Sequence, residues 1–421
     1  MILHLAFTGV VLALTVLNYY VGRRNVLYPA FLFSLIWLVV LVFYIMPFFE
    51  VDALGAYTLA VVVSGVAAFS AGAALVGRLR HSRSVAVSRP SNSIAKRVIF
   101  FCCVAFLPVF FLEIKRLGVA GGLDSLMISA RVAIVDAISN EGKTYSSPIY
   151  TAAPMLAIFT AFIFLIEAGH SRREQIWVWV SVLMASAFCI LTTGRTLILQ
   201  LAAGLMGIRL LRSGRVSLGQ AWRYARYPLI GFLALISILV PLDKELSGFN
   251  GDATNIMMNF VVEYVVAPLA GFDYLLHHPS EYKYDPNHTF RQILPVLARI
   301  SGSTHTPPPI LDDFVLVPLP TNVFTVFKFY YVDFGFGGML VVMFLIGVGQ
   351  TWLFRKALAG IDFYVFLFAI SLYPLMMVVF DDQYSLISYY VAALIFGAVY
   401  FHVLRGISLR ARVSSSTPSA G

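Results

Sequence analysis

Long apolar runs separated by short polar segments follow one another along almost the whole chain. Their length, and the scarcity of charged residues within them, predicts helices that cross a membrane rather than strands or the helices of a soluble core. The pattern fits eleven spans and is compatible with ten to twelve. The predicted spans cover residues 1–20, 27–48, 53–76, 98–112, 149–167, 176–191, 196–211, 227–242, 334–353, 361–380 and 384–404.

One further apolar stretch, residues 256–276, is interrupted by Glu263, Pro268 and Asp273. Counting it as a span would move the basic residues that follow it to the opposite side of the membrane. We therefore predict an interfacial or re-entrant helix here instead of a twelfth span.

The composition supports a membrane protein. The 421 residues are 59% hydrophobic and only 12% charged, and the mean hydropathy is +0.84, well outside the usage of soluble domains. The predicted fold is therefore an all-α polytopic integral membrane protein. Residues 1–412 are expected to form a single membrane domain, and residues 413–421 a disordered cytoplasmic tail.

The distribution of charge predicts the orientation. The segments on one side of the predicted spans hold 20 of the 30 lysines and arginines and only three of the 21 acids. By the positive-inside rule this side is cytoplasmic, which places the N-terminus outside and the C-terminus inside. The net charge of +9 is therefore about +17 inside and −8 outside, and it does not indicate a nucleic-acid partner. The two long outer segments, 113–148 and 243–333, are where we expect the function.

A short turn separates two apolar runs at residues 176–191 and 196–211, each of 16 residues. A helix of that length is about 24 Å long, less than the roughly 30 Å hydrocarbon core. The turn, and Arg195 with it, is therefore expected to lie slightly below the membrane surface. Such an arginine either faces an anion or a cavity, or extends to the lipid headgroups.

The outer segments contain further residues that suit anion binding or proton transfer. Arg131 is in line with an apolar stripe of a predicted surface helix. His288 and Arg291 lie at the start of a helix predicted from Thr289, where backbone N–H groups favour anions. His288 could act as a base. Each of these residues, and Arg299 further along, has the alternative of a solvated surface side chain.

The chain re-enters the membrane at the element Asp333-x-Gly335-x-x-Gly338, with Lys328 five residues before it. An acid at a membrane boundary is costly unless it is paired or used, and glycines allow close helix packing. Asp381 and Asp382 lie in a similar position, on the tight turn before the last span. No metal-ligand set, phosphate-binding glycine loop or hydrolase motif is present.

Four stretches together resemble the oligosaccharide repeat-unit polymerases, the O-antigen polymerase (Wzy-type) family. They are the turn TTGRT, the large outer loop, the re-entry NVFTVFKFYYVDFGFGG and the closing FDDQYS. The likeness covers most of the chain through its topology, but its motifs are confined to these stretches. Members of the family often have an even number of spans, whereas this sequence indicates eleven.

The resemblance implies a GT-C-like membrane glycosyltransferase of the bacterial inner membrane, with its active site on the periplasmic side and one large periplasmic loop. It would transfer a growing glycan from undecaprenyl diphosphate to the next lipid-linked repeat unit, needing neither a cofactor nor a metal. Donor and acceptor lipids, membrane lipids and a chain-length regulator protein would be its partners. The expected roles are catalytic for Asp333, His288 and Asp381, and diphosphate-binding for Arg195, Arg131 and Arg291, with Lys328, Asp382 and Arg299 as secondary candidates.

Several alternatives stay open. An O-antigen ligase, which transfers the glycan to lipid A–core, shares the architecture and the donor lipid. A polysaccharide or lipid transporter would need polar residues along a path through the membrane, and the ionisable residues here gather instead at the predicted outer boundary. A scaffold without catalysis is the third alternative.

The orientation is testable by labelling. Cysteines introduced at Ser247 and Ser303 should react with a membrane-impermeant thiol reagent added to intact cells, and one at Ser84 should not, because the positive-inside rule places only the first two outside. Labelling at position 84 in sealed cells would contradict the predicted orientation.

Overall fold

The structure is a computed structural model. It describes residues 2–46, 53–78, 93–117, 129–130, 148–169, 171–192, 195–214, 216–217, 219–220, 222–223, 262–279, 287–303, 314–317 and 319–405. The predicted span 227–242 and the predicted tail lie outside these residues.

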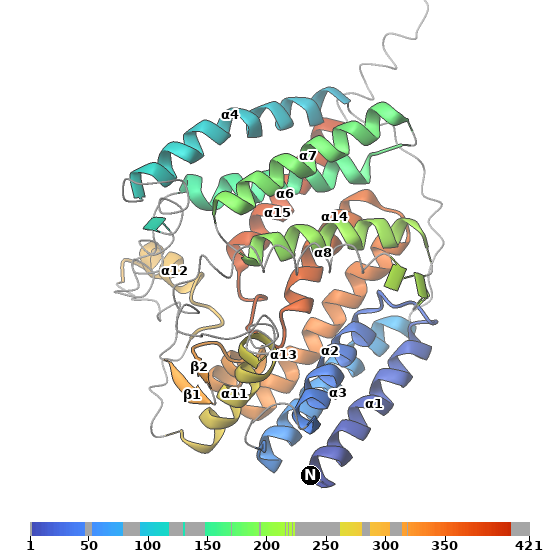
Figure 1. The fold of residues 1–421 in the computed structure, drawn as a ribbon, viewed down its shortest axis with the longest axis vertical. Coiled ribbons are helices and arrows are strands. Elements are labelled where there is room, and N and C mark those ends of the chain that lie inside the picture. Colours follow the sequence, from blue (N-terminus) through green and yellow to red (C-terminus); the bar gives the residue numbers. More distant parts are fainter. Residues whose placement is uncertain are drawn as a thin grey trace, which may run out of the picture.

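The described chain is built almost entirely of helices (Figure 1). The α-helices are α1 (Ile2–Val21), α2 (Pro29–Ile45), α3 (Ala56–Arg78), α4 (Ser93–Leu117), α6 (Pro148–Ile166), α7 (Arg172–Leu191), α8 (Arg195–Arg212), α11 (Ala267–His277), α12 (Leu294–Ser301), α13 (Phe327–Leu358), α14 (Asp362–Met376) and α15 (Ile387–Ala398). Two π-helical turns, η3 (Val262–Val266) and η4 (Val399–Leu404), adjoin α11 and α15. Strands β1 (Val315–Val317) and β2 (Leu319–Thr321) form a small antiparallel hairpin.

Within the described residues, seven helices are long and apolar enough to cross a membrane. They are α1, α3, α4, α6, α7, α13 and the continuous pair α15–η4, while α2 and α14 are apolar but shorter. The prediction of an all-helical polytopic membrane protein is thereby confirmed. The count of eleven spans stays a prediction.

Several helices are longer than the apolar runs that predicted them. The two helices of the 176–211 hairpin have 20 and 18 residues instead of 16 each, or about 30 Å and 27 Å. Both extend past charged residues, which end an apolar run but not a helix, and Ser171 caps α7 by accepting a hydrogen bond from the Glu174 N–H. The added residues are charged or polar, so the apolar part of each helix keeps its 16 residues, and the depth of Arg195 stays a prediction.

The largest helix contact joins α3 and α13, and glycines make it possible. A Cβ atom at Gly72 would collide with the backbone carbonyl of Phe344, and one at Gly347 with that of Phe69. The two backbones therefore approach each other directly, as small residues allow in membrane helices. At one end of this contact the rings of Trp37 and Phe327 stack at 4.8 Å.

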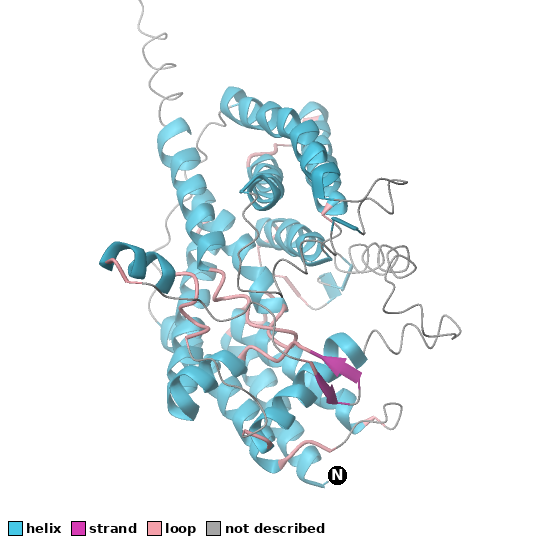
Figure 2. Cartoon of the chain, turned by 90° about the vertical axis from the view of Figure 1, so that its left-hand side faces the viewer, coloured by secondary structure: helices cyan, strands magenta, loops and turns pink. Residues whose placement is uncertain are grey.

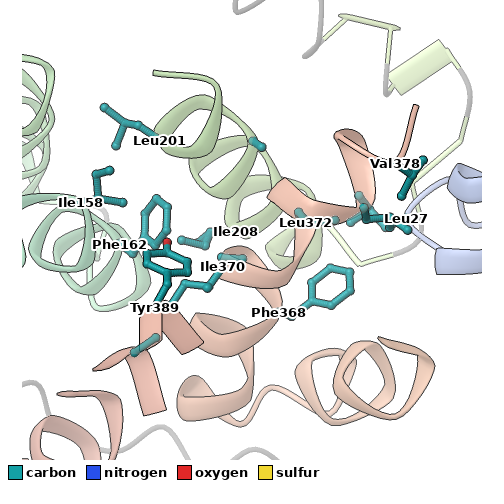
Figure 3. Close-up of a cluster of buried hydrophobic side chains, with 14 of the residues drawn as sticks. Leu27, Ile158, Phe162, Leu201, Ile208, Phe368, Ile370, Leu372, Val378 and Tyr389 are labelled. Atoms are coloured by element: carbon teal, nitrogen blue, oxygen red, sulfur yellow. The ribbon is translucent and has the colours of Figure 1, made fainter. Parts of the chain in front are cut away.

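Helix α14 connects two parts of the bundle. Figure 1 shows α1, α2, α3 and α13 in one group and α4, α6 and α7 in another, with α8, α14 and α15 between them. Helix α14 packs against α8, α13 and α15. Figure 3 shows this core, in which Phe162 of α6, Ile208 of α8 and Ile370 of α14 lie close to Tyr389 of α15.

The helix ends that the charge pattern assigns to the cytoplasmic side lie together at one end of the bundle. Arg405 pairs with Asp362 at 2.5 Å and with Glu167 at 3.8 Å, and Lys96 lies 3.6 Å from Glu167. These residues are at the ends of four helices whose flanking segments were all predicted to be cytoplasmic. We call this the basic end of the bundle. Which membrane face it occupies stays a prediction from charge.

The described part of the 256–276 stretch lies across the opposite end. The Tyr44 hydroxyl of α2 donates to the Val266 carbonyl (2.8 Å), and the Gly55 N–H before α3 donates to Asp273 (2.9 Å). The 11-residue helix α11 is largely buried, so it is a packed cap rather than a helix lying on the membrane. It continues directly from η3, and the residues before Val262 lie outside the described part, so the interfacial or re-entrant segment stays a prediction.

The glycine contact can be tested with a matched pair. Gly347→Ala should lower the thermal unfolding temperature in detergent, because overpacking a fitted contact costs about 1–3 kcal/mol. Gly349→Ala, two residues along the same helix with open space around it, should be neutral or slightly stabilising, since alanine is the better helix former. Equal effects of the two substitutions would contradict the packing described here.

Candidate functional site

Loops from four parts of the chain meet at the end opposite the basic end. They are 262–279, 287–303, 314–321 and 377–386, and we call this the loop end. Figure 2 faces this side of the molecule, with the pink loops gathered between helices and the magenta strands beside them. Most of the predicted site residues lie here.

Asp333 fastens the loop 287–289 to α13. One carboxylate oxygen accepts hydrogen bonds from the N–H groups of Asn287 (2.7 Å) and His288 (3.3 Å), and the other accepts from the Thr289 N–H (2.8 Å) and hydroxyl (2.6 Å). Both oxygens therefore carry two donors each, which is their usual capacity. Asp333 was predicted as a catalytic acid or base, and this geometry suits positioning of the loop better than proton transfer.

A break in α13 follows directly. Gly335 has φ 69° and ψ −178°, a conformation that glycine adopts and other residues avoid. The first turns of α13, from Phe327 to Asp333, can therefore take a direction different from that of the long membrane-spanning part. Gly335 thus has a conformational role instead of the predicted role in helix packing, because a Cβ atom there would meet open space.

His288 and Lys328 both contact the ring of Phe329. The imidazole of His288 is buried and stacks on the Phe329 ring at 4.7 Å. The Lys328 ammonium is only 1% exposed and lies over the rings of Phe324 (4.2 Å) and Phe329 (4.9 Å). A cation held against aromatic faces in a dry environment retains a strong attraction for anions.

Asp382 is the most perturbed acid at the loop end. It is 3% exposed, and its Oδ1 accepts from the Tyr330 hydroxyl (2.9 Å) and the Tyr384 N–H (2.8 Å). No described group donates to Oδ2 within hydrogen-bonding geometry, while the hydroxyl and the N–H of Ser385 lie near enough to lower the pKa of the carboxyl. Burial raises the pKa of this carboxyl to about 6, against the lowering effect of its hydrogen bonds.

Polar side chains extend from Asp382 into the bundle. Gln350 in α13 donates to the Ser371 carbonyl (2.9 Å) and to the Tyr384 hydroxyl (3.1 Å), and the Ser371 hydroxyl donates back to Gln350 (3.0 Å). The sequence analysis missed this network. Gln350, a polar residue inside the apolar run 334–353, was the signal that could have revealed it.

The first turn of α8 contacts the same region. Thr196 hydrogen-bonds the Tyr373 hydroxyl, which in turn donates to Gln383 at 3.2 Å. Thr196, which directly follows the Thr-Gly-Arg sequence, therefore lies beside the 377–386 loop. Arg195 is the first residue of α8, and its side chain lies outside what the structure describes.

The other predicted residues differ in their placement. Arg131 lies outside the described residues. Arg291 is half-buried in the loop fastened by Asp333, and Arg299 is exposed on α12. Asp381 is half-buried, next to Gln383 (3.5 Å). Among the described residues, no three His, Cys, Asp or Glu side chains are grouped so that they could hold a metal ion.

No protein-family model, curated protein or solved structure matches this chain. The resemblance to the repeat-unit polymerases therefore depends on the four sequence stretches alone.

Asp382 should leave a signature in the pH dependence of stability. Its pKa in the folded protein, about 6, lies above the ordinary 3.8, so folding favours the protonated form. Ionisation of this group should therefore lower the free energy of unfolding of the wild-type protein as the pH rises from about 4 to 6. The loss is up to about 3 kcal/mol, at 1.36 kcal/mol per unit of pKa difference.

Asp382→Asn should remove this loss and unfold at a higher temperature than wild type at pH 7 to 8, with the difference vanishing below pH 4. Thermal unfolding in detergent from pH 4 to 8 measures it. Asp381→Asn, with its half-buried carboxylate, is the control and should shift the curve little. A wild-type profile from Asp382→Asn would show that this carboxylate is not strained.

Proposed function

We propose that this protein is a GT-C-like membrane glycosyltransferase that polymerises lipid-linked oligosaccharide repeat units at the outer face of the bacterial inner membrane. It transfers the growing glycan from undecaprenyl diphosphate to the next lipid-linked unit. The observation that supports this most is the loop end itself. A largely apolar bundle concentrates a buried carboxylate, a buried lysine and a buried histidine at one end, with Thr196 of α8 beside the 377–386 loop.

The acceptor hydroxyl needs a base, and Asp382 suits this role best. A base must be ionised at neutral pH and must have an open lone pair. Asp382 meets both requirements, since its pKa is about 6 and its Oδ2 has no described donor. Asp333 fails the second requirement because four donors occupy its oxygens. We assign it to positioning of the loop with His288 and Arg291.

The diphosphate leaving group needs fixed positive charge. Arg195 begins α8, where the free N–H groups of the first turn already favour anions. Its planar guanidinium donates two parallel hydrogen bonds to phosphate and stays charged. Lys328 supplies a second cation on α13. Stabilisation by such donors requires no metal ion.

The reaction can be examined in a deletion strain complemented with each variant at matched expression. A polymerase defect leaves surface lipid with single-repeat caps, whereas a ligase defect removes all caps. Asp382→Asn should give single-repeat caps, and Asp381→Asn should retain long chains. Loss of all caps would favour the ligase alternative, and a wild-type ladder from every acidic variant would favour a transporter or a scaffold.

Arg195 gives the sharpest test of the diphosphate site. Arg195→Ala should abolish long chains while the protein still reaches the membrane, because one such contact contributes about 2–4 kcal/mol, or roughly 10² to 10³ in rate. Arg195→Lys should also be poorly tolerated, since an ammonium keeps the charge but loses the paired hydrogen bonds.

The matched control is Arg209→Ala, an exposed arginine toward the other end of the same helix. It should leave the polysaccharide ladder unchanged. A wild-type ladder from Arg195→Ala would contradict the diphosphate site and would indicate that the Arg195 side chain only faces the lipid headgroups.

A further inference from the structure

Helix α12 exposes most of its apolar side chains. Val296, Leu297 and Ile300 are 57%, 52% and 78% exposed, and only Ala298 is buried. Figure 1 shows α12 at the edge of the molecule, away from the long helices. An eight-residue helix with this much exposed apolar surface requires a cover outside the described chain.

The exposed face of α12 continues a face of α13 that lipid must cover. Phe290, just before α12, meets Phe334 of α13 with ring centroids 6.0 Å apart. Beyond Phe334, α13 exposes Val341 and Leu345 to 58% each, and it is one of the helices long enough to cross the membrane. The apolar surface therefore runs from the spanning helix to α12 through an aromatic contact.

The attachment of α12 holds it at the membrane boundary. Asp333, two residues before the Gly335 break in α13, binds the loop in front of α12. Closer to α12 on the same N-terminal side, the side-chain Oε1 of Gln292 accepts from the Ser388 N–H (2.8 Å) at the start of α15. Both anchors are at the loop end of membrane helices, so α12 can neither enter the bundle nor move far into water.

The charge of this segment suits a phospholipid surface. Residues 287–303 contain Arg291 and Arg299 and no aspartate or glutamate. Arg299 is exposed on α12 among the apolar side chains. A short basic helix with one apolar face is the pattern of helices that lie in the headgroup region of a bilayer.

We propose that α12 is a membrane-surface helix, with Val296, Leu297 and Ile300 inserted among the outer lipids and Arg299 against their phosphates. Its partner is the phospholipid leaflet that surrounds the protein. The inference uses the exposure, the anchors and the charge of the segment, and it holds whatever reaction the loop end performs.

Spin labels measure the depth directly. The full chain, with Cys102, Cys103 and Cys189 replaced by alanine, is reconstituted in phosphatidylcholine–phosphatidylglycerol vesicles with single labelled cysteines at Leu297, Ile300 or Ser303. Labels at 297 and 300 should collide with oxygen, which concentrates in lipid, and be protected from a water-soluble nickel chelate. The label at 303, beyond the end of α12, should show the reverse.

A second variant tests the role of the arginine. Arg299→Glu should move the label at 297 toward water and at least double its collision rate with the nickel chelate, because the reversed charge is repelled by the phosphates. Gel filtration in detergent checks that each variant is folded.

Two results would overturn the proposal. High nickel access at 297 in wild-type protein would make α12 a helix in water. Protection from both oxygen and nickel would mean that protein covers it, either a second copy or another part of the chain. An unchanged depth of the label at 297 in Arg299→Glu would contradict the contact between Arg299 and the lipid phosphates.

Discussion

A polar group inside this bundle must find its partner within the protein, because lipid offers none. Asn18 of α1 shows how strictly the constraint acts, since its amide donates to the Ala30 carbonyl of α2 (3.2 Å), to Ser34 (3.2 Å) and to Ser70 of α3 (2.9 Å). One side chain thereby fixes the relative positions of three helices. The glycine contacts between α3 and α13 then bring a fourth helix against them. The positions of the loops at both ends follow from this packing.

The same constraint is met in different ways at the two ends of the bundle. At the basic end, Glu167 is 1% exposed, but Lys96 and Arg405 both face it, and Arg405 also pairs with Asp362. Removing one partner of a buried ion pair leaves a buried charge without compensation, which costs more free energy than the intact pair contributes. These charges therefore hold the ends of α4, α6, α14 and α15 together. At the loop end, Asp333 and Asp382 accept hydrogen bonds from N–H and hydroxyl groups, and Asp273 lies 3.5 Å from His277.

Sequence patterns predicted the class of fold because twenty apolar residues in a row have few alternatives to a membrane helix. They also grouped the helix ends correctly, since lysine and arginine mark one face. They placed helix ends wrongly where charged residues continue a helix, as at Arg172 in α7, and they missed that α13 begins at Phe327 before the Gly335 break. The hydrogen-bond donors to a carboxylate come from residues far apart in the sequence. The sequence alone therefore could not distinguish Asp333 from Asp382.

A contrast between three acids, Asp333, Glu167 and Asp382, identifies the unusual one. Asp333 has a full set of donors, and Glu167 has two cations. Asp382 is held by donors of Tyr330, Tyr384 and Ser385 alone, with no cation among the groups that shift its pKa, and burial still raises that pKa to about 6. A carboxylate kept buried and incompletely satisfied weakens the fold, and a sequence under selection for stability alone would replace it with asparagine. An ionisable side chain kept in such a place at a cost to stability is a candidate for one that function rather than folding determines.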